Sequence, residues 1–152
     1  MNWIITNERG IINQRWDPLT LTKILLVDDE PDITFTLKCI LKDNGIQINP
    51  FNDPIIALKS YKRYFYDLVI LDIKMPKMDG FELYIKIRER DPNVKICFLT
   101  AIATINDGFI KLNSEFDRII SEGYFIQKPI KTQDLIKKIV TLINKDIITM
   151  QI

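Results

Sequence analysis

Residues 68–80 read LVILDIKMPKMDG, an apolar run that stops at Asp72 and is followed by a short loop ending at Gly80. An uninterrupted apolar run of this kind is typical of a strand in a parallel sheet, because helices cover both faces of such a strand. Similar runs stop at three other short motifs, which are VDDE at 27–30, LTA at 99–101 and QKP at 127–129. The polar residues of all four motifs are therefore expected at the carboxyl ends of strands.

Predicted strands and helices alternate along the chain. The strands are expected at residues 23–27, 46–51, 68–71, 94–99 and 124–126. Helical spacing occurs at 31–44, at 81–90 and from Thr132 onward. A further helix is expected to begin at Asp53, its N-cap, with Ile55, Leu58, Tyr61 and Phe65 on one face. This alternation predicts an α/β domain with a doubly wound, five-stranded parallel sheet and right-handed crossovers. Ligands of such sheets bind beyond the carboxyl ends of the strands, where the four motifs lie.

Length and composition limit the class of protein. The chain has 152 residues, of which 47% are hydrophobic and 27% charged, with a net charge of +1. This length is enough for one well-buried core, and we expect a domain at 22–146 between an N-terminal extension (1–21) and a C-terminal tail (147–152). The balanced charge provides no strong field toward nucleic acid or membrane. The sequence contains neither a signal peptide nor an apolar segment of ~20 residues, so we expect a cytoplasmic protein without membrane contact.

The chain contains no histidine and two cysteines. A phosphohistidine donor, a Ser-His-Asp triad and a histidine-ligated zinc site are therefore excluded within this sequence. Cys39 and Cys97 lie far apart in apolar runs, which is typical of reduced, buried thiols.

Asp28, Asp29 and Asp72 are expected to converge at one edge of the sheet. Such carboxylates repel one another unless protons or a cation intervene, and oxygen ligands without imidazole or thiolate favour Mg²⁺. Asp72 is the candidate nucleophile toward a phosphoryl group, since a carboxylate can form an acyl phosphate. Lys128 would supply a positive charge to a phosphoryl oxygen and Thr100 a hydroxyl donor. Pro129 could follow a cis peptide bond that directs Lys128 inward.

VDDE, LDIKMPKMDG, LTA and QKP together resemble, in the same order, the receiver domain of two-component response regulators. The resemblance covers about residues 22–146 and implies the flavodoxin-like strand order 2-1-3-4-5. It implies that Asp72 is the phospho-acceptor, that Asp28 and Asp29 are the acidic Mg²⁺ pair, and that Lys128 is the lysine of the site. It further implies a metal-ligating backbone carbonyl at Lys74, a switch hydroxyl on Thr100 and a switch aromatic ring at Phe125.

The resemblance also implies how such a protein works. A sensor histidine kinase or a phosphotransfer protein donates phosphate to Asp72, Thr100 moves toward the phosphoryl group and Phe125 rotates inward. The face made by the fourth helix, the strand at 124–126 and the helix from Thr132 then changes its preference among protein partners. We expect a signalling domain rather than an enzyme, with a downstream protein target and a second copy of the chain as candidate partners. Outside residues 22–146 we expect neither an output domain nor a DNA-binding helix-turn-helix.

Three alternatives are weaker. A phosphorylation-silent pseudo-receiver, acting only as an interaction module, does not need the full set of site residues found here. A phosphatase of the haloacid dehalogenase type needs a second Asp two residues after the nucleophile, where this chain has Lys74. Nucleotide binding through a glycine-rich loop is disfavoured because neither GxGxxG nor GxxxxGK[ST] occurs.

The interval between Thr100 and Lys128 is longer than the family usually has, which indicates either a longer helix or loop or an unusual partner surface.

Overall fold

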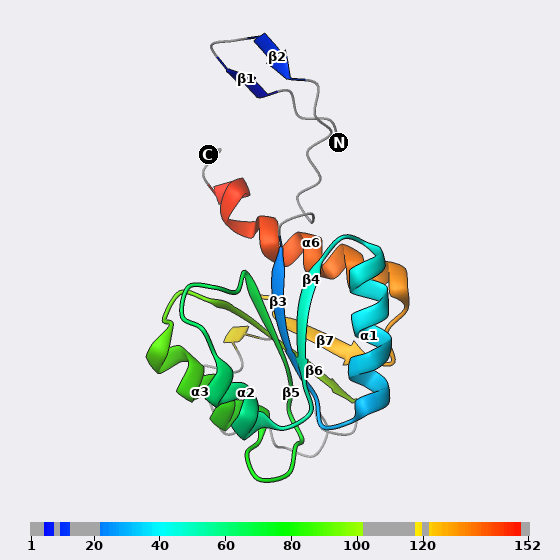
Figure 1. Ribbon diagram of the computed structural model, residues 1–152, viewed down its shortest axis with the longest axis vertical. Helices are drawn as coiled ribbons and strands as arrows, with labels where there is room; N and C mark the ends of the chain where they lie inside the picture. The colour runs from blue at the N-terminus through cyan, green and yellow to red at the C-terminus, as the bar shows by residue number, and fades with distance from the viewer. Residues whose placement is uncertain (1–4, 8–9, 13–21, 102–117, 120–121, 150–152) are drawn as a thin grey trace.

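The computed structural model describes residues 5–7, 10–12, 22–101, 118–119 and 122–149. Within them, a parallel sheet is formed by β3 (Lys23–Val27), β4 (Gln47–Phe51), β5 (Leu68–Asp72), β6 (Lys95–Ala101) and β7 (Phe125–Lys128). The strands lie in the order β4-β3-β5-β6-β7 (Figure 1). Numbered along the chain, this is the order 2-1-3-4-5, so the predicted doubly wound fold is confirmed.

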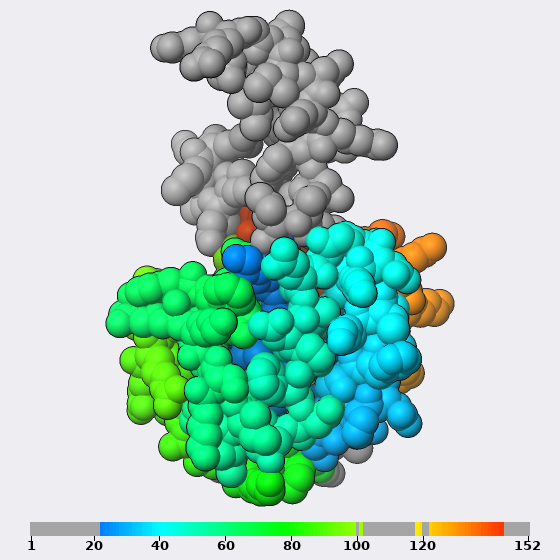
Figure 2. Space-filling view, in the orientation of Figure 1, coloured from blue at the N-terminus to red at the C-terminus, as the bar shows by residue number. Residues whose placement is uncertain are grey.

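Helices cover both faces of this sheet. They are α1 (Pro31–Asp43), α2 (Pro54–Ser60), α3 (Gly80–Arg90) and α6 (Thr132–Thr149). Figure 1 shows α2 and α3 on one face and α1 and α6 on the other, and an apolar cluster fills each interface. In the space-filling view, the surfaces of α2, β4 and α1 hide most of β3 from this side (Figure 2). Residues 24–27 of β3 are accordingly 0% exposed, which explains their uninterrupted apolar sequence.

The two segments outside the predicted domain contain structure that the sequence did not indicate. Near the N-terminus, β1 (Ile5–Asn7) pairs antiparallel with β2 (Gly10–Ile12). Strands of three residues are too short to show a recognisable alternation of apolar and polar residues. At the other end, α6 continues past residue 146 to Thr149, into the expected tail. Among the described helices, none is both long and apolar enough to cross a membrane.

The helix predicted from Asp53 onward is shorter than expected. α2 ends at Ser60, and the backbone of Tyr61 is extended (φ −62°, ψ 128°), so Tyr61 and Phe65 do not belong to the helix. The segment after α2 is held instead by the carboxylate of Asp91, which is 2% exposed. Its Oδ2 accepts a hydrogen bond from the Tyr61 hydroxyl at 2.9 Å and another from the Tyr64 backbone N–H at 3.0 Å. These tertiary bonds hold the chain away from the helical path that the apolar spacing alone predicted.

Replacing Asp91 with alanine is expected to lower the free energy of unfolding by about 2–3 kcal/mol, because a buried hydroxyl and a partly buried N–H lose their acceptor. Urea denaturation would measure the change. Asp67→Ala is the matched control, since Asp67 also accepts from a backbone N–H (Lys23, 2.8 Å) but at an exposed position. We expect Asp67→Ala to lose about 1 kcal/mol or less. Equal losses in the two variants would contradict the assigned role of Asp91.

Candidate functional site

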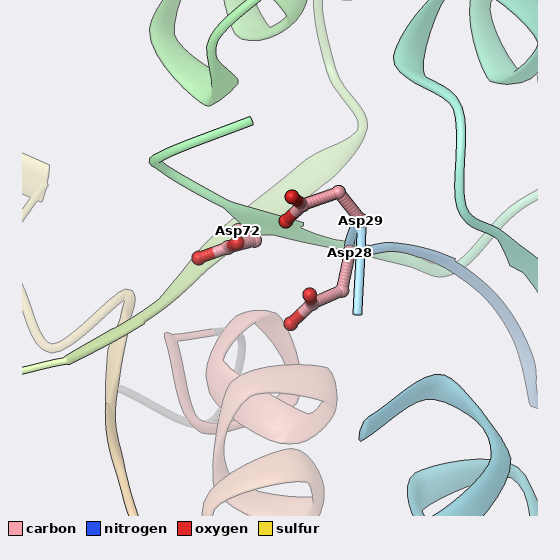
Figure 3. A group of neighbouring side chains, drawn as sticks. All are labelled: Asp28, Asp29 and Asp72. Carbon is pink, nitrogen blue, oxygen red and sulfur yellow. The ribbon is translucent and has the colours of Figure 1, made fainter. Parts of the chain in front are cut away.

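The ends of β3 and β5 bring the predicted acidic residues together. One carboxylate oxygen from each of Asp28, Asp29 and Asp72 lies within 4.8 Å of the others. The register explains this arrangement, because Val27 pairs with Leu71. Asp28 and Asp29 follow Val27 in the sequence, and Asp72 follows Leu71. Figure 3 shows Asp28 and Asp29 just after the end of β3, with their carboxylates turned apart and Asp72 beside them. Asp28 is 0% and Asp72 5% exposed, so two of the carboxylates are almost fully withdrawn from solvent.

Lys128 reaches the same cluster from the end of β7. Its Nζ lies 2.7 Å from Asp28 Oδ2 and 3.6 Å from Asp72 Oδ1. A third carboxylate, that of Glu30, lies 3.6 Å away, and sequence analysis did not single it out. The peptide bond between Lys128 and Pro129 is cis, as the sequence suggested. The structure thus brings together four of the predicted residues, with Lys128 as the counter-charge of the buried Asp28.

Burial and mutual repulsion make this site electrostatically unusual. Burial, and then the negative charge of Asp28, raise the pKa of Asp72 to about 7, although Lys128 partly offsets them. Burial also raises the pKa of Asp28, against the opposing effect of its ion pair with Lys128. Burial alone would lower the pKa of the Lys128 ammonium, yet its bond to Asp28 and the nearby negative charges leave it raised. The acidic cluster therefore holds excess negative charge, which a proton or a metal cation would relieve.

The loop after β5 is closed tightly against the start of α3. The Gly80 N–H donates to the Ile73 carbonyl oxygen at 2.8 Å, and the Met78 N–H donates to that of Pro76 at 2.8 Å. Asp79 caps α3, because its side chain accepts from the Glu82 N–H at 2.9 Å. Lys77 adopts a left-handed backbone (φ 70°), and its side chain forms a 2.7 Å ion pair with Asp53, the residue before α2. This loop carries Lys74, the predicted carbonyl ligand, and Lys74 itself is exposed.

The predicted switch residues are placed only in part. Thr100 belongs to β6 and pairs with Gln127 of β7 at the same edge of the sheet, while the position of its hydroxyl lies outside the described structure. Phe125 begins β7, pairs with Phe98 and packs partly buried against the apolar cluster beneath α2 and α3. Most of the long interval from Thr100 to Lys128, at 102–117 and 120–121, lies outside the described residues. The roles of Thr100, Phe125 and the Lys74 carbonyl remain predictions.

Sequence reasoning missed the contacts that the turn between β4 and α2 makes with the segments carrying the acidic residues. Asn52 donates from Nδ2 to the Asp28 carbonyl oxygen at 2.8 Å, and Asp53 both caps α2 and holds Lys77. Asp53 was recognisable as a helix cap, but its second partner was not. A usable signal for Asn52 does exist, since it is a polar residue that directly follows a predicted strand at the edge where the acidic residues gather.

Comparison with known proteins gives one consistent family. The family model for the response regulator receiver domain matches residues 24–140. The sensor protein EvgS of Escherichia coli K12 is 40% identical over 93 residues, covering 59% of this chain and 8% of EvgS. The response regulator receiver protein CpdR of Brucella abortus is 30% identical over 119 residues, covering 78% of this chain and 94% of CpdR.

Solved structures agree with this result. The crystal structure of a response regulator receiver domain protein from Clostridium thermocellum has a TM-score of 0.67 and 26% sequence identity. The match covers 85% of this chain and 99% of that one. By contrast, the chain spans less than half the length of several curated relatives that it matches.

Proposed function

Because the chain belongs to the family of response regulator receiver domains of two-component systems, we propose that Asp72 accepts a phosphoryl group from a sensor histidine kinase or a phosphotransfer protein. The observation that carries this proposal is the cluster of Asp28, Asp29 and Asp72, with the Lys128 ammonium against Asp28 and Asp72. The proposed receiver domain spans 22–146, and its phosphorylation state changes which proteins it contacts.

The donor set fits Mg²⁺. The carboxylates of Asp28, Asp29 and Asp72 are hard oxygen ligands. Among the described residues, these three acidic groups are accompanied by one ammonium, that of Lys128, which contacts Asp28 and Asp72. Asp28, Asp29 and Asp72 would hold the ion together with the carbonyl oxygen of Lys74. When bound, Mg²⁺ would neutralise negative charge that otherwise keeps the pKa of Asp72 high and repels an incoming phosphoryl group.

In the proposed transfer, a carboxylate oxygen of Asp72 attacks the phosphorus atom of the donor. A new O–P bond forms, the bond between phosphorus and the donor's leaving atom breaks, and its electron pair leaves with the donor. Lys128 lies 3.6 Å from Asp72 Oδ1, so its ammonium can stay paired with Asp28 while approaching a phosphoryl oxygen on Asp72. Little further covalent chemistry is needed, since phosphoryl transfer depends mainly on positioning and on charge stabilisation.

The phosphorylated state would act through Thr100 and Phe125. We propose that the Thr100 hydroxyl donates to the new phosphoryl group and that Phe125, at the start of β7, follows it inward. Both lie on adjacent strands, β6 and β7, which supports a coupled movement. The surface beside β7 and α6 would then present a different face to a downstream protein. The competing proposal is a pseudo-receiver, in which the same surfaces bind partners without phosphorylation.

The test is incubation with acetyl phosphate and Mg²⁺, followed by intact-mass measurement. We expect an increase equal to one phosphoryl group in the wild type, and none in Asp72→Asn or when a chelator removes Mg²⁺. Asp79→Asn is the matched control, because Asp79 lies at the other end of the same loop and caps α3. It should still be phosphorylated. A wild type that acquires no phosphoryl group and binds no beryllofluoride would leave the pseudo-receiver as the better proposal.

A further inference from the structure

The end of β4 and the turn that joins it to α2 bind the backbone of Asp28 on both sides. The Asp28 N–H donates to the Phe51 carbonyl oxygen at 3.1 Å. The Asp28 carbonyl oxygen accepts from Asn52 Nδ2 at 2.8 Å. Both polar groups of the Asp28 main chain are thus bound by two consecutive residues, Phe51 at the end of β4 and Asn52 in the turn that follows. The peptide that links Asp28 to Asp29 is thereby fixed in orientation, and the orientation of this peptide sets the direction in which Asp29 leaves the strand.

Asn52 also binds the other end of the acidic loop. Its Nδ2 donates to the Thr34 hydroxyl at 2.9 Å, and that hydroxyl donates to the Pro31 carbonyl oxygen at 3.0 Å. Thr34 is 4% exposed and lies in the first turn of α1, immediately after the loop of residues 28–30. A single amide group therefore connects the start of this loop with the helix that follows it. Moving the start of this loop relative to α1 would break one of these bonds.

The next residue of the turn extends the connection to the second acidic strand. Asp53 accepts from the Ile55 N–H at 2.8 Å through Oδ1 and pairs with Lys77 at 2.7 Å through Oδ2. Lys77 belongs to the loop that follows Asp72. The turn is thus in contact with both segments that carry the proposed metal ligands, although none of its own side chains belongs to the acidic cluster.

We propose that Asn52 is a positioning residue for divalent-cation binding. It touches neither the ion nor the phosphoryl group. Its amide holds the Asp28–Asp29 peptide so that the carboxylate of Asp28 pairs with Lys128. Figure 3 shows the carboxylate of Asp29 turned away from that of Asp28. The inference rests on the proposed function of this site. Partners that orient metal ligands typically change metal affinity by about 10–100-fold when they are removed.

The experiment compares Asn52→Ala with Asn44→Ala in the full chain. Asn44 is the matched control, because its Nδ2 also donates to a backbone carbonyl at 2.8 Å, that of Ile40, at the far end of α1. Both variants should lower the urea midpoint. Isothermal titration with Mg²⁺ should show affinity weakened about tenfold in Asn52→Ala and within about twofold of the wild type in Asn44→Ala. Without any metal, amide hydrogen exchange at residues 28–34 should be faster only in Asn52→Ala.

A Mg²⁺ affinity of Asn52→Ala within about twofold of the wild type would overturn the inference. If Asn52→Ala does not fold, the pair Thr34→Val and Thr34→Ser decides, since only the serine variant keeps the hydroxyl that accepts from Asn52. Weaker Mg²⁺ binding in Thr34→Val alone supports the inference, and equal binding in both variants contradicts it. A wild type that binds no Mg²⁺ and accepts no phosphoryl group would instead count against the proposed function, so the two failures can be told apart.

Discussion

Replacing Gly80 with alanine is expected to lower the free energy of unfolding by about 3 kcal/mol and to slow phosphorylation of Asp72 at least about tenfold. A Cβ atom at this position would overlap the carbonyl oxygen of Asp72 and lie 2.9 Å from the Ile73 Cα. Both neighbours are backbone atoms, so neither can move aside by a rotamer change. The start of α3 must therefore separate from the end of β5, and this breaks the 2.8 Å hydrogen bond from Gly80 to Ile73.

Urea denaturation and the initial rate of acyl phosphate formation would measure the two effects. Gly45→Ala is the control, since Gly45 has a positive φ of 77° in the turn after α1, remote from the site. A left-handed alanine there should lose about 1 kcal/mol and leave the rate unchanged. If Gly80→Ala resembled Gly45→Ala in both measurements, the close approach of β5 to α3 would not be what positions Asp72.

The central part of the fold was predictable because it depends on local sequence. Residues 68–72 are buried throughout, and that burial requires the continuous apolar run from which the strand was predicted. Once the strands are parallel, the residues that follow them meet at one edge, so Asp28, Asp29, Asp72 and Lys128 were predictable as neighbours. The strand order itself came from the family resemblance and not from the pattern.

What escaped prediction depends on pairs distant in the sequence. Asp91 binds Tyr61 and Tyr64 just after α2, about 30 residues before it, and no local pattern indicates that pairing. The contact of Asn52 with Asp28 and the pairing of Asp53 with Lys77 escaped prediction for the same reason, because each joins segments that are distant in the sequence. Turn residues are usually interpreted by their local role, as Asp53 was in the prediction of a helix cap. Their second contacts become visible only after the sheet is assembled.

Replacing Asp72 with asparagine is expected to stabilise the metal-free protein by about 2 kcal/mol at pH 8. In the folded wild type, burial and the charge of Asp28 raise the pKa of Asp72 from 3.8 to about 7. Folding therefore opposes ionisation of this carboxyl group. Because the folded protein binds the proton more tightly than the unfolded chain, the wild type loses stability as the pH rises from about 4 to about 7. Asparagine carries no charge at any of these pH values and avoids this loss.

The pH and metal dependence distinguish this electrostatic effect from improved packing. The gain in Asp72→Asn should fall by about half between pH 8 and pH 5, since Asp72 is protonated in the folded wild type at the lower pH. Saturating Mg²⁺ at pH 8 should stabilise the wild type more than the variant and so narrow the difference, because the ion binds the folded carboxylates. Asp32→Asn, at an exposed position of α1, should change stability by less than about 0.5 kcal/mol at either pH. A gain in Asp72→Asn that is equal at pH 5 and pH 8, and unaffected by Mg²⁺, would mean that repulsion among the carboxylates does not limit the stability of the metal-free protein.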